Sequence, residues 1–282
     1  MCGYAPVWMV RSSTSRTMTF RTEAELGDQH DLRQQDTGTK TIVGCWSYPR
    51  LGHDGYCSPT RHVNFPRMSR EITMSRYLFS SHDGYGLGHV RRNVLIAREV
   101  ARCEPDAEIT LVTGVSRRPG WLQDPRFTVV AVPPLLKNAQ GDYDNPGLGL
   151  RAAVAERARI FANTVADLRP DVVVVDRHPY GTAGELRAGL IAARRQGATI
   201  LLGLRDVIDD VAAVRRELEG PGWEGVNRLF DEVLVFGNPL LCDHEREYGL
   251  PIRPTYCGWV VEAPTQQVRD DNLVVISAGR FS

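Results

Sequence analysis

Short apolar runs alternate with longer amphipathic segments along the chain from residue 76 onwards. The run DVVVVD at 171–176 is typical of a strand that is covered on both faces. Regular alternation of this kind predicts an α/β protein with a Rossmann-like, doubly wound parallel sheet. The predicted strands are 77–81, 108–113, 127–132, 171–176, 198–204, 232–236 and 255–260, and the predicted helices are 89–103, 148–168, 182–196, 207–218 and one that ends near Tyr248, before Gly249.

The two ends of the chain differ from this regular middle. Residues 1–73 are rich in Arg, Ser, Thr, Gly and Asp and follow neither a helical nor a strand period. We therefore expect a disordered segment, or an extension created by a start codon placed too early. Residues 74–261 are predicted to form the Rossmann-like domain. Residues 262–282 are predicted to form a polar linker and then a strand at 273–278, which would be the first strand of a truncated second domain.

A glycine-rich loop lies between the first predicted strand and the first predicted helix. Glycines permit tight turns and a close approach of backbone to ligand, and the start of the following helix attracts anions. The spacing is GxGxG, however, and the second strand ends without the acidic residue that a nicotinamide dinucleotide site requires. The loop is therefore predicted to bind a phosphate or an acceptor molecule through Asp83, Gly84, Tyr85, Gly86, Leu87 and Gly88.

His89 follows this loop at the expected start of the helix. A neutral imidazole at that point can take a proton from a ligand hydroxyl near neutral pH. It needs an acidic partner to orient it, and Asp176 fills this role if the strands 77–81 and 171–176 are neighbours. Asp83 is the local alternative. The equally weighted interpretation is that His89 only caps the helix or bonds a nearby loop.

Other polar residues follow strands and are candidates to line a cleft at the carboxyl edge of the sheet. They are His178, Arg205 and Asp206. Asp206 also fits a simpler interpretation, in which it caps the next helix and Asp209 supplies an acidic residue to the first turn.

Composition narrows the classes of function. Lys and Arg together number 34, as do Asp and Glu, so the formal net charge is zero and gives no support to a nucleic-acid binder. Arginines at 91, 92, 98 and 102 share one predicted helix, and a solvated helix face is favoured over a track that binds phosphates.

The six cysteines show neither CxxC spacing nor a zinc-type set with histidine. They indicate free thiols in a reducing compartment. No apolar run approaches the roughly 20 residues that span a bilayer. We expect a cytoplasmic protein without metal or cofactor, in which contact with membranes is at most peripheral.

Five segments resemble, in this order, segments of predicted bacterial glycosyltransferases related to the N-acetylglucosaminyltransferase that makes lipid II. The similarity extends from about residue 74 to residue 279. The segments are SSHDGYGLGHVRRNVLIAREV, VVVVDRHPYGTAGEL, LLGLRDVIDD, EVLVFGNPLLCDHEREYGLP and TYCGWV.

The resemblance implies a GT-B fold, in which two Rossmann-like domains face each other. The N-terminal domain of such enzymes binds the acceptor, and the C-terminal domain binds a nucleotide-sugar donor, commonly a UDP-sugar. Gly88 and His89 match the family's Gly-His, whose histidine serves as the base of an inverting transfer, and Asp176 matches the supporting aspartate. In the family, a strand like 273–278 is followed by the donor domain, whereas this chain ends at Ser282. We therefore expect that this chain does not transfer sugar alone.

Two alternatives remain open at this stage. One is a Rossmann-like binding module that holds a phosphorylated or glycosylated ligand without catalysis. The other is a sugar-nucleotide epimerase, which releases free UDP without an acceptor. The acceptor, the donor sugar and the oligomeric state are not indicated by the sequence.

Overall fold

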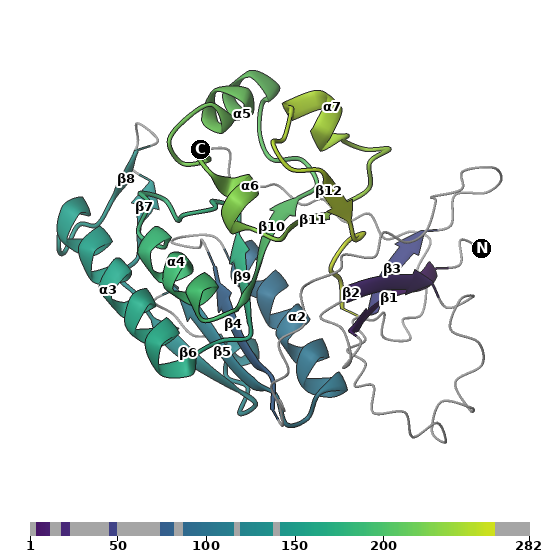
Figure 1. Ribbon diagram of the computed structural model, residues 1–282, viewed down its shortest axis with the longest axis horizontal. Coiled ribbons are helices and arrows are strands. Elements are labelled where there is room, and N and C mark those ends of the chain that lie inside the picture. The colour runs from purple at the N-terminus through teal and green to yellow at the C-terminus, as the bar shows by residue number, and fades with distance from the viewer. Residues whose placement is uncertain are drawn as a thin grey trace, which may run out of the picture.

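The computed structural model describes residues 74–81, 87–115, 119–137 and 142–262, together with the backbone of three strands near the N-terminus (Figure 1). These strands are β1 (Tyr4–Arg11), β2 (Met18–Thr22) and β3 (Cys45–Pro49), which form an antiparallel sheet in the order β2-β1-β3. The sequence pattern predicts no strand in this region. The remaining residues of 1–73, for which disorder is predicted, and the predicted strand 273–278 lie outside the described residues.

A seven-stranded parallel sheet forms the centre of the protein, as the alternating pattern predicts. The strand order is β12-β11-β10-β9-β4-β5-β6. Each strand is rich in β-branched or large apolar residues, which suit a surface buried on both sides. The strands are β4 (Arg76–Ser80), β5 (Glu108–Thr113), β6 (Phe127–Ala131), β9 (Val172–Asp176), β10 (Thr199–Arg205), β11 (Glu232–Phe236) and β12 (Pro254–Tyr256).

Helices cover both faces of this sheet, so two apolar cores form (Figure 1). On one face, α2 (Gly88–Cys103) buries Val90 and Val94 with Phe79 of β4. On the other face, α3 (Leu150–Leu168) and α4 (Arg187–Arg195) pack together. This second core also includes residues of α5 (Val211–Leu218), α6 (Val226–Leu229) and α7 (His244–Tyr248).

Three predicted boundaries differ from the structure by about four or five residues, and the others agree more closely. The helix expected at 182–196 begins only at Arg187, because Gly181 and Gly184 adopt left-handed φ angles of 83° and 82° in the preceding turns. The helix expected at 207–218 begins at Val211, where the Asp210 side chain caps it by accepting the Ala213 amide hydrogen. The last strand covers Pro254–Tyr256 rather than 255–260.

Four further short elements were not predicted. They are the 3-10 turn η1 (Gly120–Leu122), the α6 helix, and the hairpin of β7 (Leu136–Lys137) and β8 (Tyr143–Asp144) inside the long loop after β6. Across the described parts of the chain, the helices are too short or too polar to span a membrane.

Candidate active site

The strand order creates a switch point between β4 and β9. From β4 the chain winds outward through β5 and β6, and it then crosses back to place β9 on the other side of β4. In open parallel sheets the crevice at the carboxyl ends of two such strands is the usual ligand position. The helix α2, which follows β4, begins here. Asn93 of α2 is fully buried and donates from Nδ2 to Ser81 Oγ at 2.9 Å, which fixes the helix to the end of its strand.

His89 and Asp176 meet at this switch point. His89 Nδ1 lies 3.0 Å from Asp176 Oδ1. The aspartate side chain is 1% exposed and the histidine side chain 24% exposed, so the carboxylate is enclosed while the imidazole remains accessible. The predicted condition, that strands β4 and β9 be neighbours, is confirmed by their pairing from Tyr77 with Val172 to Ser80 with Val175.

Arg92 is the third member of this group, which the sequence pattern did not indicate. Its Nη2 lies 2.5 Å from Asp176 Oδ1 and 3.1 Å from His89 Nδ1. Its guanidinium also lies over the Phe236 ring, 4.8 Å from the ring centre. The interpretation of residue 92 as part of a solvated helix face is therefore wrong, since its side chain is only 15% exposed. Its position one helical turn after His89 was the available signal, because residues i and i+3 share a face.

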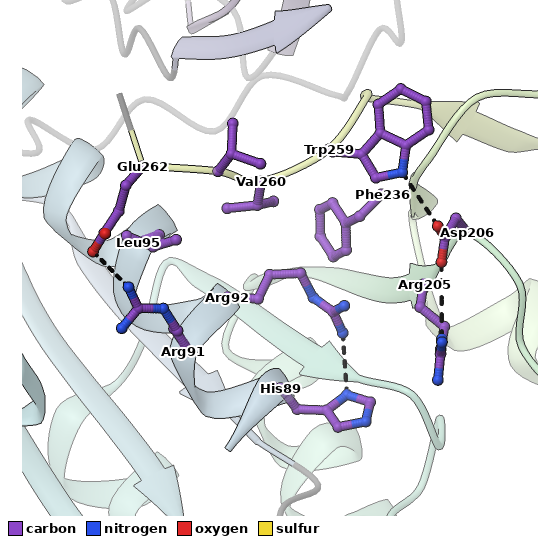
Figure 2. Close-up of a pocket in the computed structure, with 12 residues that line it drawn as sticks. His89, Arg91, Arg92, Leu95, Arg205, Asp206, Phe236, Trp259, Val260 and Glu262 are labelled. Atoms are coloured by element: carbon purple, nitrogen blue, oxygen red, sulfur yellow. Dashed lines mark hydrogen bonds and ion pairs between the residues drawn. The ribbon is translucent and has the colours of Figure 1, made fainter. Parts of the chain in front are cut away.

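A cavity of about 640 Å³ opens beside these residues (Figure 2). Its polar side carries His89, Arg92 and Arg205, while Phe236 and Trp259 contribute apolar surface. The cavity is large enough for a small organic ligand, and its lining combines apolar side chains with several charged ones. The lining residues are Gly88, His89, Arg91, Arg92, Leu95, Arg205, Asp206, Phe236, Trp259, Val260, Val261 and Glu262.

Arg205 and Asp206 line this cavity, as predicted for a cleft. Asp206 Oδ2 accepts a hydrogen bond from Trp259 Nε1 at 3.2 Å, which holds the indole at the cavity wall (Figure 2). Asp206 does not cap α5, so the capping interpretation is wrong and Asp210 has that role. Gly237 permits this arrangement, because a Cβ there would lie 2.5 Å from the Cβ of Asp206.

His178 lies elsewhere, in an ion-pair cluster. Its Nδ1 is 3.2 Å from Glu217 Oε1, and Arg177 donates to both oxygens of the same carboxylate at 2.9 and 2.8 Å. Burial lowers the pKa of His178. Burial alone would raise the pKa of Glu217, but the hydrogen bonds from His178 and Arg177 outweigh it and lower that pKa well below its ordinary value. His178 is not among the residues that line the cavity.

The glycine-rich loop is described only at its end. Asp83, Gly84, Tyr85 and Gly86 lie outside the described residues, so their predicted roles stay predictions. Leu87 precedes α2 and is 43% exposed, and Gly88 is the first residue of the helix and lines the cavity. In the part of the chain that the structure describes, no three His, Cys, Asp or Glu side chains gather as metal ligands would.

Several cavity residues were not predicted, namely Arg91, Leu95, Phe236, Trp259, Val260, Val261 and Glu262. Arg91 Nη2 forms an ion pair with Glu262 Oε1 at 2.8 Å across the cavity edge (Figure 2). The segment TYCGWV was noticed for its resemblance to the family, but nothing in its pattern indicated that it returns to the start of α2.

No protein-family model and no curated protein matches the sequence. Solved plant structures match it in part. A UDP-glucosyltransferase from Polygonum tinctorium capable of glucosylating indoxyl is 12% identical, with a TM-score of 0.43, over 70% of this chain and 55% of that chain. UGT2 of Phytolacca americana, complexed with UDP-2-fluoro-glucose and pterostilbene, is 12% identical with a TM-score of 0.38, over 64% of this chain and 52% of that one.

A third structure is a UGT transferase from Siraitia grosvenorii in complex with UDP. It is 12% identical with a TM-score of 0.34, over 55% of this chain and 34% of its own. This chain therefore spans between about a third and just over half of the length of these proteins. Similarity at this level concerns the backbone alone.

Proposed function

We propose that this chain is the acceptor-binding half of an inverting GT-B glycosyltransferase, which transfers a hexosyl group from a nucleotide sugar to an acceptor hydroxyl. The single observation that carries the proposal is the contact between His89 and the enclosed Asp176 at the switch point, beside a cavity of about 640 Å³. The resemblance of five segments to lipid II-related glycosyltransferases supports it, and that family suggests a UDP-sugar as the donor.

The geometry suits a base that removes a proton from a hydroxyl. If His89 carries its proton on Nδ1 and donates it to Asp176 Oδ1, the lone pair on Nε2 is available for the acceptor. The base then takes the acceptor proton as the acceptor oxygen bonds to the anomeric carbon. The bond from that carbon to the nucleoside diphosphate breaks on the opposite face, which inverts the configuration.

The cavity also offers positive groups to the departing diphosphate. Arg205 lines it with a side chain that is 53% exposed, and the amino end of α2 carries the positive end of the helix dipole. In GT-B enzymes the donor is held by a second domain, so in this proposal the nucleotide sugar approaches from a partner domain. The described residues supply the acceptor side and the base.

Sugar transfer tests this proposal directly. The purified chain, with and without a separately produced donor domain of a GT-B glycosyltransferase, is incubated with radiolabelled UDP-glucose or UDP-N-acetylglucosamine and a panel of phenolic, sugar and lipid-linked acceptors. Any transfer should fall at least about 10²-fold in His89→Gln, because the amide cannot accept the proton. The matched control is His178→Gln, which removes a histidine that lies outside the cavity. Equal turnover by wild type and His89→Gln contradicts the assignment of the base.

The second candidate is a binding module for a phosphorylated or glycosylated ligand. The observation that favours it is the presence of Arg91, Arg92 and Arg205 around one cavity. Saturable binding of a sugar phosphate that is lost in Arg205→Ala, without transfer from any donor, supports this alternative. Transfer that depends on His89 excludes it. Release of free UDP in the absence of acceptor would instead favour the epimerase.

A further inference from the structure

Two nitrogen atoms converge on one oxygen of Asp176. Arg92 Nη2 lies 2.5 Å and His89 Nδ1 lies 3.0 Å from Oδ1, and the two nitrogens are 3.1 Å apart. The other carboxylate oxygen, Oδ2, is buried and has no hydrogen-bond partner among the described residues. His89 therefore contacts the same carboxylate oxygen as the Arg92 guanidinium, and the guanidinium can influence which partner donates in the hydrogen bond between His89 and Asp176.

The charge of Asp176 needs a counter-ion because its side chain is 1% exposed. A buried carboxylate is stable only when a positive group compensates it, and otherwise it takes up a proton. Arg92 is the only arginine or lysine that pairs with Asp176 within the described ranges. A neutral His89 supplies a hydrogen bond without supplying charge. Arg92 thus supplies the positive charge beside Asp176, and His89 supplies a second polar contact.

We infer that Arg92 is a positioning residue that selects the tautomer of His89. Beside the guanidinium, Asp176 is an ionised, acceptor-only group, so His89 must carry its proton on Nδ1 and expose the lone pair of Nε2. Without Arg92, the buried carboxyl holds a proton and donates it to Nδ1. The ring proton then moves to Nε2 and the base is lost. This inference rests on the proposed role of His89.

The same distances also allow the opposite tautomer of His89. Arg92 Nη2 lies 3.1 Å from His89 Nδ1, so it could donate there if the ring carried its proton on Nε2. The contact with Asp176 is shorter, at 2.5 Å, and joins opposite charges. Charge-assisted hydrogen bonds are about twice as strong as neutral ones. The arginine is therefore expected to direct its hydrogen to the carboxylate and leave Nδ1 protonated.

Nitrogen NMR of the imidazole rings tests this tautomer without any need for turnover. The full chain is labelled with ¹⁵N-histidine and studied at about pH 7.5, where an ordinary imidazole is mostly neutral. His89→Gln identifies the His89 signals by their disappearance. The wild type is expected to show a protonated Nδ1 and an unprotonated Nε2 at His89. Arg92→Met should move the proton to Nε2, whereas Arg92→Lys, which keeps the charge, should retain it on Nδ1.

His178 is the internal reference, because its contact is with Glu217 and its signals should not change in the Arg92 variants. Arg92→Gln is the second neutral variant should Arg92→Met fail to fold. A wild-type ring protonated on Nε2, or a neutral variant that keeps the proton on Nδ1, overturns the inference.

Turnover gives a separate readout. If the chain transfers sugar, kcat should fall at least about 10²-fold in Arg92→Met and recover in part in Arg92→Lys, with KM changed less than kcat. An asparagine in place of the orienting aspartate of a hydrolase triad, which also yields the wrong tautomer, costs about 10⁴-fold. Equal turnover by wild type and His89→Gln combined with the expected NMR result would defeat the proposed function and leave the role of Arg92 intact.

Discussion

Replacing Glu185 by leucine is expected to lower the free energy of unfolding by about 3–5 kcal/mol. Glu185 is fully enclosed, at 0% exposure of its side chain, and Oε1 accepts from Arg157 Nε at 3.0 Å. Arg157, in α3, is 7% exposed and also donates from Nη1 to the Pro133 carbonyl at 2.9 Å. Oε2 of Glu185 accepts from the Ala183 amide at 2.9 Å. The pair therefore joins α3 to the loop after β6 and to the loop that follows Asp176.

The size of the expected loss in stability depends on which charge remains buried after the substitution. In Glu185→Leu the Arg157 guanidinium stays in a site that water hardly reaches and loses its counter-ion, so the variant carries an uncompensated buried charge. The double variant Arg157→Met with Glu185→Leu removes both charges and keeps apolar volume. It is expected to recover at least half of the loss, because apolar replacement of a buried pair is often neutral.

The assay is urea unfolding followed by circular dichroism at pH 7, with linear extrapolation to water. Glu156→Gln is the matched control, since its pair with Arg159 joins residues of the same helix that are 38% and 61% exposed. It should leave the unfolding midpoint unchanged within error. The reasoning is refuted if Glu185→Leu is as stable as this control, or if the double variant is no more stable than Glu185→Leu.

Three further changes test other parts of the structure. Gly203→Ala should lower the free energy of unfolding by about 1–3 kcal/mol, because the added Cβ would lie 2.7 Å from Cε2 of Phe236. Thermal unfolding measures this loss, and an unchanged Tm contradicts the expectation. Phe161→Ala should cost about 3–5 kcal/mol in urea, since it empties a fully buried position between α3 and α4, and a loss below about 1 kcal/mol would show that the site collapses. Burial lowers the pKa of His178 from 6.5, so the unfolded chain binds a proton below pH 6.5 that the folded chain does not, and stability falls as the pH falls through that range. His178→Gln should flatten this part of the pH–stability curve measured by urea unfolding, and an unchanged slope contradicts the argument.

The candidate site was predictable in part. His89 was found because a glycine-rich loop between a strand and a helix places the first helical residues at the carboxyl edge of a sheet. Asp176 was a conditional prediction, since its distance from His89 depended on whether the two strands were neighbours. Arg92 was misjudged because its charge resembled that of a solvated face, and its burial depends on Phe236, which lies far away in sequence. Trp259 had no local signal at all.

What the sequence by itself determined is local. The apolar runs and the helical periodicity of apolar residues define the strands and helices to within a few residues, because these patterns show which side of each segment is buried. The strand order, the contact of His89 with Asp176 and Arg92, and the return of Trp259 to the cavity were decided only by the tertiary structure. The physical reason is that neighbours in a parallel sheet are chosen by the packing of helices on both faces, and that packing sums many contacts between residues distant in sequence.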